Sequence, residues 1–254
     1  LVADEAVRFI EENRTPWFVY VPFHAVHTPV DAPKEYKALY DGVLFDRDPE
    51  RQDSRLRIAA RKYQPRLRRS MPLGDAPSDD GLTPPPVAVN LSASQFRHDI
   101  PELVHDMLTE FELPARLLEL ELTESMLMRD VPHAIEVLNR LRAMGVHVSI
   151  DDFGTGYSSL AYLRLFDVQQ LKIDRSFVSS MLEDHDKMVI VRTILSLAES
   201  LNLKVTAEGI ETQALALQLQ NLGCWQGQGY YFARPMNEAD AFDYWRARWN
   251  FETI

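Results

Sequence analysis

Residues 146–160 read VHVSIDDFGTGYSSL, and this stretch decides how the rest of the chain is interpreted. Its first five residues alternate β-branched and polar types, which predicts a buried strand. Two adjacent carboxylates, Asp151 and Asp152, follow where that strand stops, before a glycine-containing turn. Two carboxylates this close repel each other unless a cation lies between them, which points to a hard divalent metal. The alternative is an Asx-type turn that caps the next helix.

The composition is that of a soluble globular protein with a substantial core. The chain has 254 residues, of which 46% are hydrophobic and 26% charged. A single cysteine, Cys224, excludes a disulfide framework and a multi-cysteine zinc site. No apolar run is long enough to span a bilayer, and no signal peptide opens the chain. We therefore expect a cytoplasmic protein without a membrane segment.

The net charge of −11 comes mostly from residues 87–254, which hold 24 acidic and 14 basic side chains. An acidic body argues against general nucleic-acid binding, because such binding depends on neutralising phosphates. A phosphorylated ligand would need metal ions between the like charges.

The N-terminal part differs in pattern from the rest. An amphipathic helical segment precedes a predicted strand, TPWFVYVPF, at residues 15–23. Residues 9–41 resemble a fragment of the sulfatase family, but the Cys or Ser nucleophile motif of sulfatases is absent, so no sulfatase chemistry is expected. We divide the chain into a sulfatase-like fragment at 1–70, a proline- and glycine-rich linker at 71–86, and a third part at 87–254.

From residue 87 onward, short apolar strands alternate with helical segments. The predicted strands are 87–91, 117–123, 146–150, 170–173, 203–207 and 229–233. The predicted helices are 101–111, 131–144, 159–165, 187–201, 212–222 and 238–249. Six strands that are each followed by a helix predict parallel βα units, and hence a doubly wound sheet or a (β/α) barrel.

Polar residues at the strand ends favour the barrel. They are Asn90, Glu121, Asp151 with Asp152, Lys172 with Asp174, and Glu208. In a barrel these positions converge on one mouth, where the active sites of this fold lie. Each residue has a simpler explanation as a helix cap, a first-turn charge or a surface position. The coincidence of all of them at the same end of successive strands favours a site.

Oxygen and amide ligands of this kind select Mg²⁺ or Mn²⁺ rather than zinc. We expect Asn90, Glu121 and Asp151 to hold one ion, with Asp151 bridging to a second ion held partly by Asp152. Two such ions can clamp a phosphodiester and generate hydroxide from water. Lys172 could orient that water or balance charge, and Glu208 could take a proton. The pattern predicts metal-dependent phosphodiester hydrolysis.

Six ordered motifs resemble those of the EAL domain family. They are VNLS (89–92), ELTES (121–125), DDFGTGYSSL (151–160), LKIDRSF (171–177), AEGIET (207–212) and QGYYFARP (228–235). The resemblance spans about residues 85–248 and implies a TIM-type (β/α) barrel that opens cyclic di-GMP to linear pGpG with two Mg²⁺ or Mn²⁺ ions.

The resemblance also implies a role for each matching residue. The metal ligands would be Asn90, Glu121, Asp151 and Asp152, and the catalytic residues would be Lys172 and Glu208. The supporting residues would be Glu124, Asp174, Glu211 and Gln228.

One part of the family pattern is missing. The Glu-Ala-Leu signature and its following arginine should precede residue 87, and nothing in residues 1–86 matches them. We therefore expect an incomplete barrel of six βα units with an extra N-terminal segment, in which TPWFVYV packs against the open edge. Three hypotheses follow: an impaired phosphodiesterase, an inactive module that binds cyclic di-GMP or a protein partner, and a non-functional fusion fragment. A homodimer stays open as an assembly state.

Overall fold

The structure is a computed structural model that describes residues 18–19, 86–93, 95–97, 99–156, 160–236 and 244. The rest of the sulfatase-like fragment, nearly all of the expected linker and all but Tyr244 of the helix expected at 238–249 lie outside these residues. Among the described residues, no helix combines the length and the apolar character needed to cross a bilayer.

The described secondary structure alternates strands and helices along the chain. The strands are β1 (Phe18–Val19), β2 (Val87–Asn90), β3 (Leu118–Thr123), β4 (His147–Phe153), β5 (Gln170–Ile173), β6 (Lys204–Ala207) and β7 (Gln226–Gly227). The α-helices are α5 (Ile100–Glu110), α6 (Glu124–Leu127), α7 (Val131–Ala143), α8 (Leu160–Leu163), α9 (Arg175–Val178), α10 (His185–Leu201) and α11 (Gln213–Asn221). Two short 3-10 helices, η2 (Gln95–Arg97) and η3 (Ala115–Leu117), complete the elements.

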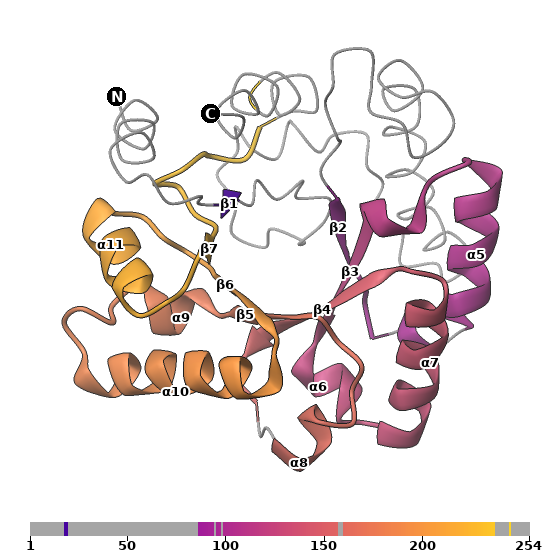
Figure 1. The fold of residues 1–254 in the computed structure, drawn as a ribbon, viewed down its shortest axis with the longest axis horizontal. Coiled ribbons are helices and arrows are strands. Elements are labelled where there is room, and N and C mark those ends of the chain that lie inside the picture. The colour runs from indigo at the N-terminus through magenta and orange to yellow at the C-terminus, as the bar shows by residue number, and fades with distance from the viewer. Residues whose placement is uncertain are drawn as a thin grey trace.

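All strand pairs are parallel, and the strand order in the sheet is β1-β7-β6-β5-β4-β3-β2. Figure 1 shows that the sheet curls into an arc, with the helices along its convex side. The order from β2 to β7 follows the chain, as it does in a barrel and not in a doubly wound sheet. This confirms the predicted fold class, an incomplete TIM-type (β/α) barrel.

Strand β1 lies at the edge of the sheet beyond β7. Phe18 is opposite Gln226, and Val19 is opposite Gly227. The predicted strand TPWFVYV therefore does pair with an edge of the barrel-like sheet, through two of its residues. The edge that it occupies is that of β7, the last strand among the described residues.

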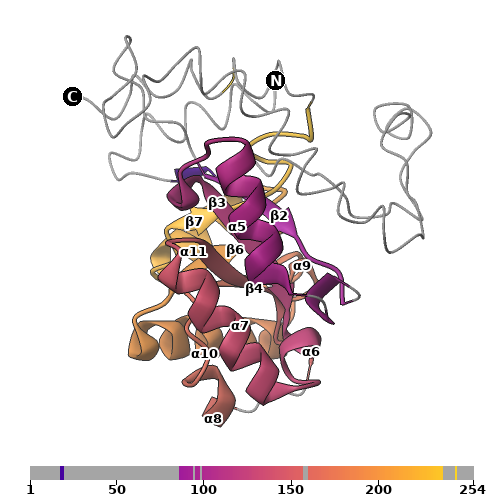
Figure 2. The same ribbon diagram turned by 90° about the vertical axis from the view of Figure 1, so that its right-hand side faces the viewer.

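The helices bury their apolar faces against the outer face of the sheet. In β3, Leu118, Leu120 and Leu122 belong to the hydrophobic core, and they alternate with Glu119 and Glu121. Successive side chains of a strand point to opposite faces, so the glutamates point to the inside of the arc. Helices α5 and α7 lie side by side over this part of the sheet (Figure 2). The polar residues of the strands consequently face inward.

Several helix ends carry residues that are typical of helix caps. Asp130 caps α7, because its side chain accepts a hydrogen bond from the N–H of His133. Gly145 and Gly223 follow α7 and α11 with φ angles of 84° and 85°. The sequence did not predict α6 and α9, because a single helical turn leaves too few residues to show a period.

The strand expected at residues 229–233 is wrong. Strand β7 is Gln226–Gly227, and residues 229–232 form turns. Gly229 packs directly on the backbone of Ile210, where a Cβ atom would lie 2.1 Å from the Ile210 carbonyl oxygen. The N–H of Tyr231 donates to that same carbonyl oxygen at 3.0 Å. Tyr231 and Phe232 are thus buried where this segment crosses the β6–α11 loop, and not by strand pairing.

Candidate active site

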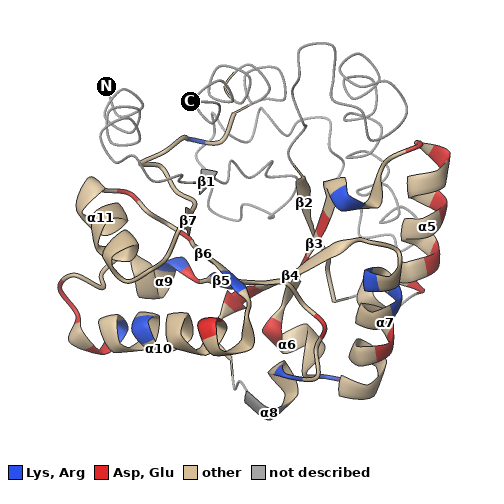
Figure 3. Ribbon diagram, viewed as in Figure 1, with Lys and Arg blue, Asp and Glu red and all other residues tan. Residues whose placement is uncertain are grey.

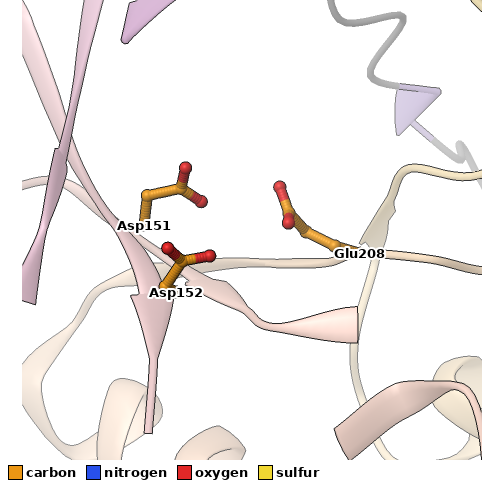
Figure 4. Close-up of side chains that lie close together, drawn as sticks. All are labelled: Asp151, Asp152 and Glu208. Atoms are coloured by element: carbon orange, nitrogen blue, oxygen red, sulfur yellow. The ribbon is translucent and has the colours of Figure 1, made fainter. Parts of the chain in front are cut away.

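The end of β4 turns two consecutive carboxylates to the same side. The pairing of β4 with β5 shifts register between Ile150 and Phe153, and Asp152 has a φ of 54°, in the left-handed region. In a regular strand, Asp151 and Asp152 would point to opposite faces. The local kink brings both carboxylates to the inner side, and Glu208 faces them from the end of β6 (Figure 4).

These three acids form a compact set of oxygen ligands. One carboxylate oxygen from each of Asp151, Asp152 and Glu208 lies within 4.8 Å of the other two. Asp151 is buried, whereas Asp152 and Glu208 are half-buried. Carboxylate oxygens at this spacing, partly open to solvent, suit a hard divalent cation.

Lys172 on β5 connects this set to Glu121 on β3. Its Nζ atom lies 2.7 Å from Oε1 of Glu121, 3.2 Å from Oδ1 of Asp151 and 2.6 Å from Oε1 of Glu208. The side chains of Lys172, Glu121 and Asp151 are 3%, 5% and 3% exposed. Figure 3 shows acidic residues within β3 and β4 and a basic residue at β5, in the sheet itself. Four carboxylates and one ammonium group therefore meet inside the arc.

Burial and charge act in opposite directions on these groups. Burial alone would lower the pKa of Lys172, but the carboxylates of Glu121, Glu208 and Asp151 outweigh it and raise that pKa above its ordinary value. Burial raises the pKa of Glu208 to about 7, the ammonium of Lys172 opposes this rise, and the Asp151 carboxylate adds to it. Lys172 is thus a permanent cation, and Glu208 is poised to exchange a proton near neutral pH.

Asn90 and Gln228 lie at the ends of strands on either side of the cluster. Asn90 on β2 is opposite Glu121 in register, and the N–H of Leu91 donates to the Glu121 carbonyl oxygen at 3.0 Å. Gln228 directly follows β7, and its N–H donates to the Ala207 carbonyl oxygen at 2.8 Å. The side-chain Oε1 atom of Gln228 is buried and has no hydrogen-bond partner within the described part of the chain.

The other three predicted supporting residues, Glu124, Asp174 and Glu211, lie in different surroundings. Glu124 is buried at the start of α6, and its Oε2 atom accepts a hydrogen bond of 3.4 Å from the N–H of Gly154. It therefore braces the loop that follows the aspartate pair. Asp174 caps α9 by accepting from the N–H of Ser176 at 2.9 Å. Glu211 is exposed at the start of the segment that leads into α11.

The donor set fits a divalent cation. Beside the three carboxylates within 4.8 Å, the buried Oε1 of Gln228 lacks a hydrogen-bond partner among the described residues. The buried Oδ1 of Asp151 has only the 3.2 Å ion-pair contact with Lys172. Buried oxygens of this kind are costly unless a donor or a cation satisfies them.

The sequence profile of the family described as EAL domain matches residues 70–235, more than half of the chain. The chain belongs to the EAL domain family. The matched range begins at residue 70, the last residue of the sulfatase-like fragment, earlier than the start near residue 85 that the motifs indicate.

EAL relatives and solved EAL structures agree with this assignment. MucR of Pseudomonas aeruginosa, a bifunctional diguanylate cyclase/cyclic di-GMP phosphodiesterase, is 48% identical over 151 residues, which cover 59% of this chain and 22% of MucR. The solved PaMucR phosphodiesterase in complex with c-di-GMP superposes with a TM-score of 0.67 at 38% identity, covering 83% of this chain and 86% of that chain.

The manganese/cy-diGMP complex of Klebsiella pneumoniae BlrP1 at pH 6 superposes with a TM-score of 0.61 at 27% identity, covering 77% of this chain and 47% of that chain. BlrP1 is also solved as a calcium/cy-diGMP complex, so divalent ions accompany the dinucleotide in that protein. The chain spans only about a fifth of the length of the curated relatives that it matches.

Proposed function

We propose that this chain is an EAL-type phosphodiesterase domain that hydrolyses cyclic di-GMP to linear pGpG with two Mg²⁺ or Mn²⁺ ions, at a reduced rate. The observation that carries the proposal is the buried contact of Lys172 with Glu121, Asp151 and Glu208, next to the kinked Asp151–Asp152 pair. Burying these charges costs desolvation free energy, because each of them loses its hydration. Stability alone therefore does not readily explain the arrangement.

The cation-binding residues would be Asn90, Glu121, Asp151 and Asp152. When bound, the divalent ions would supply positive charge for the phosphodiester and lower the pKa of water. Glu121 and Asp151 also contact Lys172, so a cation and the ammonium would share these carboxylates. Lys172 would then be left to balance the negative charge that develops on the phosphate.

Glu208 is the residue that we propose to accept the proton of the attacking water. Its pKa of about 7 lets the carboxylate take up a proton and release it again near neutral pH. Its side chain is 16% exposed, more than those of Lys172, Glu121 and Asp151. It can therefore be reached from the inner face of the sheet. The 2.6 Å contact with Lys172 holds its Oε1 atom in a fixed direction.

The reduced rate follows from a missing ligand. The 254 residues contain no Glu-Ala-Leu tripeptide, so the glutamate that the family pattern places in the metal site has no counterpart in this sequence. A two-ion mechanism depends on the occupancy and position of both ions, and losing one ligand commonly costs large factors in affinity or rate.

The decisive experiment compares the chain with a version that carries an intact EAL-bearing N-terminal segment before Pro85. We expect the natural chain to form pGpG under saturating Mn²⁺ at least about a hundredfold more slowly, which is about 3 kcal/mol in the barrier. Glu208→Gln in the grafted version is the negative control. Equal rates would show that a residue of 1–86 replaces the missing glutamate. Binding of cyclic di-GMP without pGpG formation by either version would identify a binding module instead.

A further inference from the structure

A second layer of polar side chains lies inside the sheet, directly below the proposed site. Five consecutive strands each contribute one residue to this layer and, two positions later, one residue to the site. The layer residues are Glu119, Ser149, Gln170, Thr206 and Gln226, and the site residues above them are Glu121, Asp151, Lys172, Glu208 and Gln228. Because a strand repeats every two residues, the layer is the immediate support of the site.

Hydrogen bonds run through this layer across four strands. The Nε2 atom of Gln170 on β5 donates to Oε1 of Glu119 on β3 at 3.4 Å and to Oγ1 of Thr206 on β6 at 3.1 Å. The hydroxyl of Thr206 donates in turn to Oε1 of Gln226 on β7 at 3.3 Å. Thr206 is fully buried, and Glu119 is 6% exposed. We call this set of contacts the interior chain.

The interior chain is an unusual way to fill a barrel. The interiors of (β/α) barrels are usually packed with branched apolar side chains. The buried Glu119 carboxylate and the buried Gln170 amide cost desolvation energy, which apolar side chains of the same size would avoid. Breaks of a local rule of this kind are expected where function requires them. The alternation of LELELT indicates that Glu119 points inward, but the layer residues precede the carboxyl ends of their strands, where site residues are expected.

We propose that the interior chain positions the site above it. By linking β3, β5, β6 and β7 through inward-facing residues two positions before the site residues, it fixes the lateral spacing of the strands that carry Glu121, Lys172, Glu208 and Gln228. Glu119 and Thr206 are thus positioning residues that contact neither substrate nor cation. The claim about cation binding rests on the proposed function, whereas the claim about strand spacing does not.

The first test needs no metal. Thr206→Val removes the hydroxyl with little change in shape, and Thr193→Val, at an exposed hydroxyl that donates to the Val189 carbonyl on α10, is the matched control. We measure amide hydrogen exchange at Glu208 and Gln228, whose N–H groups link β5 to β6 and β6 to β7 above the layer. Relative to the amides of α7, both amides should exchange at least about tenfold faster in Thr206→Val than in the natural chain. In Thr193→Val their exchange rates should be unchanged.

The second test measures Mn²⁺ affinity of the whole chain by electron paramagnetic resonance, with urea unfolding of the same samples. Glu119→Gln keeps an acceptor for Gln170, and Glu119→Leu removes it. We expect the leucine variant to bind Mn²⁺ about tenfold or more weakly, as second-layer changes commonly do. The glutamine variant should remain within about twofold of the natural chain, and neither variant should unfold at a lower urea concentration.

Three results would overturn the inference. Unchanged exchange at both amides in Thr206→Val would show that the strands keep their spacing without the interior chain. Equal losses of Mn²⁺ affinity in Glu119→Gln and Glu119→Leu would show that the carboxylate charge matters and the hydrogen bond does not. A loss of affinity that tracks a loss of stability would reduce the layer to a packing role. A natural chain that binds no Mn²⁺ would refute the proposed function alone, and the exchange test would still decide the spacing.

Discussion

Replacing Lys172 by methionine should destabilise the protein strongly and make its stability depend on divalent cations. The change removes an ammonium that lies 2.6–3.2 Å from three carboxylates, with three of the four side chains at most 5% exposed. Methionine fills a similar volume, so the packing loss is small. The carboxylates of Glu121, Asp151 and Glu208 would be left buried without their cation.

The magnitude follows from the burial of this cluster. Breaking a buried ion pair by removing one partner typically costs about 3–5 kcal/mol, because the remaining charge stays uncompensated. Three contacts on one ammonium are not additive, since they share a single charge, so we expect about 3–5 kcal/mol in total. A divalent cation bound by the same carboxylates should restore most of the lost free energy of unfolding, since a ligand that binds only the folded state stabilises it.

The assay is urea unfolding at pH 7.5, with a chelator and with excess Mn²⁺. The control is Lys187→Met, which loses a 2.6 Å hydrogen bond to the hydroxyl of Ser180, the one side-chain hydrogen bond of Lys187 within the described residues, and should cost about 1 kcal/mol or less. A Lys172→Met variant within about 1 kcal/mol of the natural chain in chelator would refute the electrostatic reasoning. A large loss that Mn²⁺ does not reduce would refute the claim that the cation and the ammonium share the same carboxylates.

Three further predictions concern separate parts of the molecule. Mn²⁺ should raise the melting temperature of the natural chain but not that of Asp151→Asn, measured by calorimetry, and equal shifts would argue against this ligand set. Burial raises the pKa of Cys224 from 9.0 to about 11. The unfolded thiol then loses its proton first, so stability should fall between pH 9 and 11 by up to about 3 kcal/mol more than in Cys224→Ala, measured by urea titrations at each pH. Gly229→Ala should cost about 3 kcal/mol or more because a Cβ would meet the Ile210 backbone at 2.1 Å, whereas Gly223→Ala, with nothing within 4 Å and a φ of 85°, should cost about 1 kcal/mol by the same assay; equal costs would contradict the close approach.

The sequence predicts the fold well where the signal is local. The strand at 170–173 is predicted with its observed bounds, and the helix at 131–144 ends within one residue of α7. The prediction fails at residues 229–233, because an apolar, aromatic run looks the same whether it pairs as a strand or packs over a loop. The backbone approach of Gly229 to Ile210 is a long-range fact that no short window contains.

The sequence predicts that the candidate site residues lie near one another, but it does not predict which side chains contact each other. Strand ends in a parallel barrel must converge, so the order of residues along the chain is enough to place Glu121, Lys172 and Glu208 near one another. That one ammonium contacts three carboxylates depends on side-chain conformations and on the register of β3, β4, β5 and β6. The left-handed conformation of Asp152 could not be predicted either, since a positive φ is uncommon for any residue other than glycine.

Lys172 offsets the charge repulsion within the carboxylate cluster. Four carboxylates this close repel one another, and a single buried cation offsets much of that repulsion. The burial that raises the pKa of Glu208 to about 7 offsets more, because a proton can then occupy that carboxylate near neutral pH. Under the proposed function, a divalent cation bound by these carboxylates would have to rearrange the same groups. The residues that we propose for catalysis thus also limit the charge repulsion within the fold.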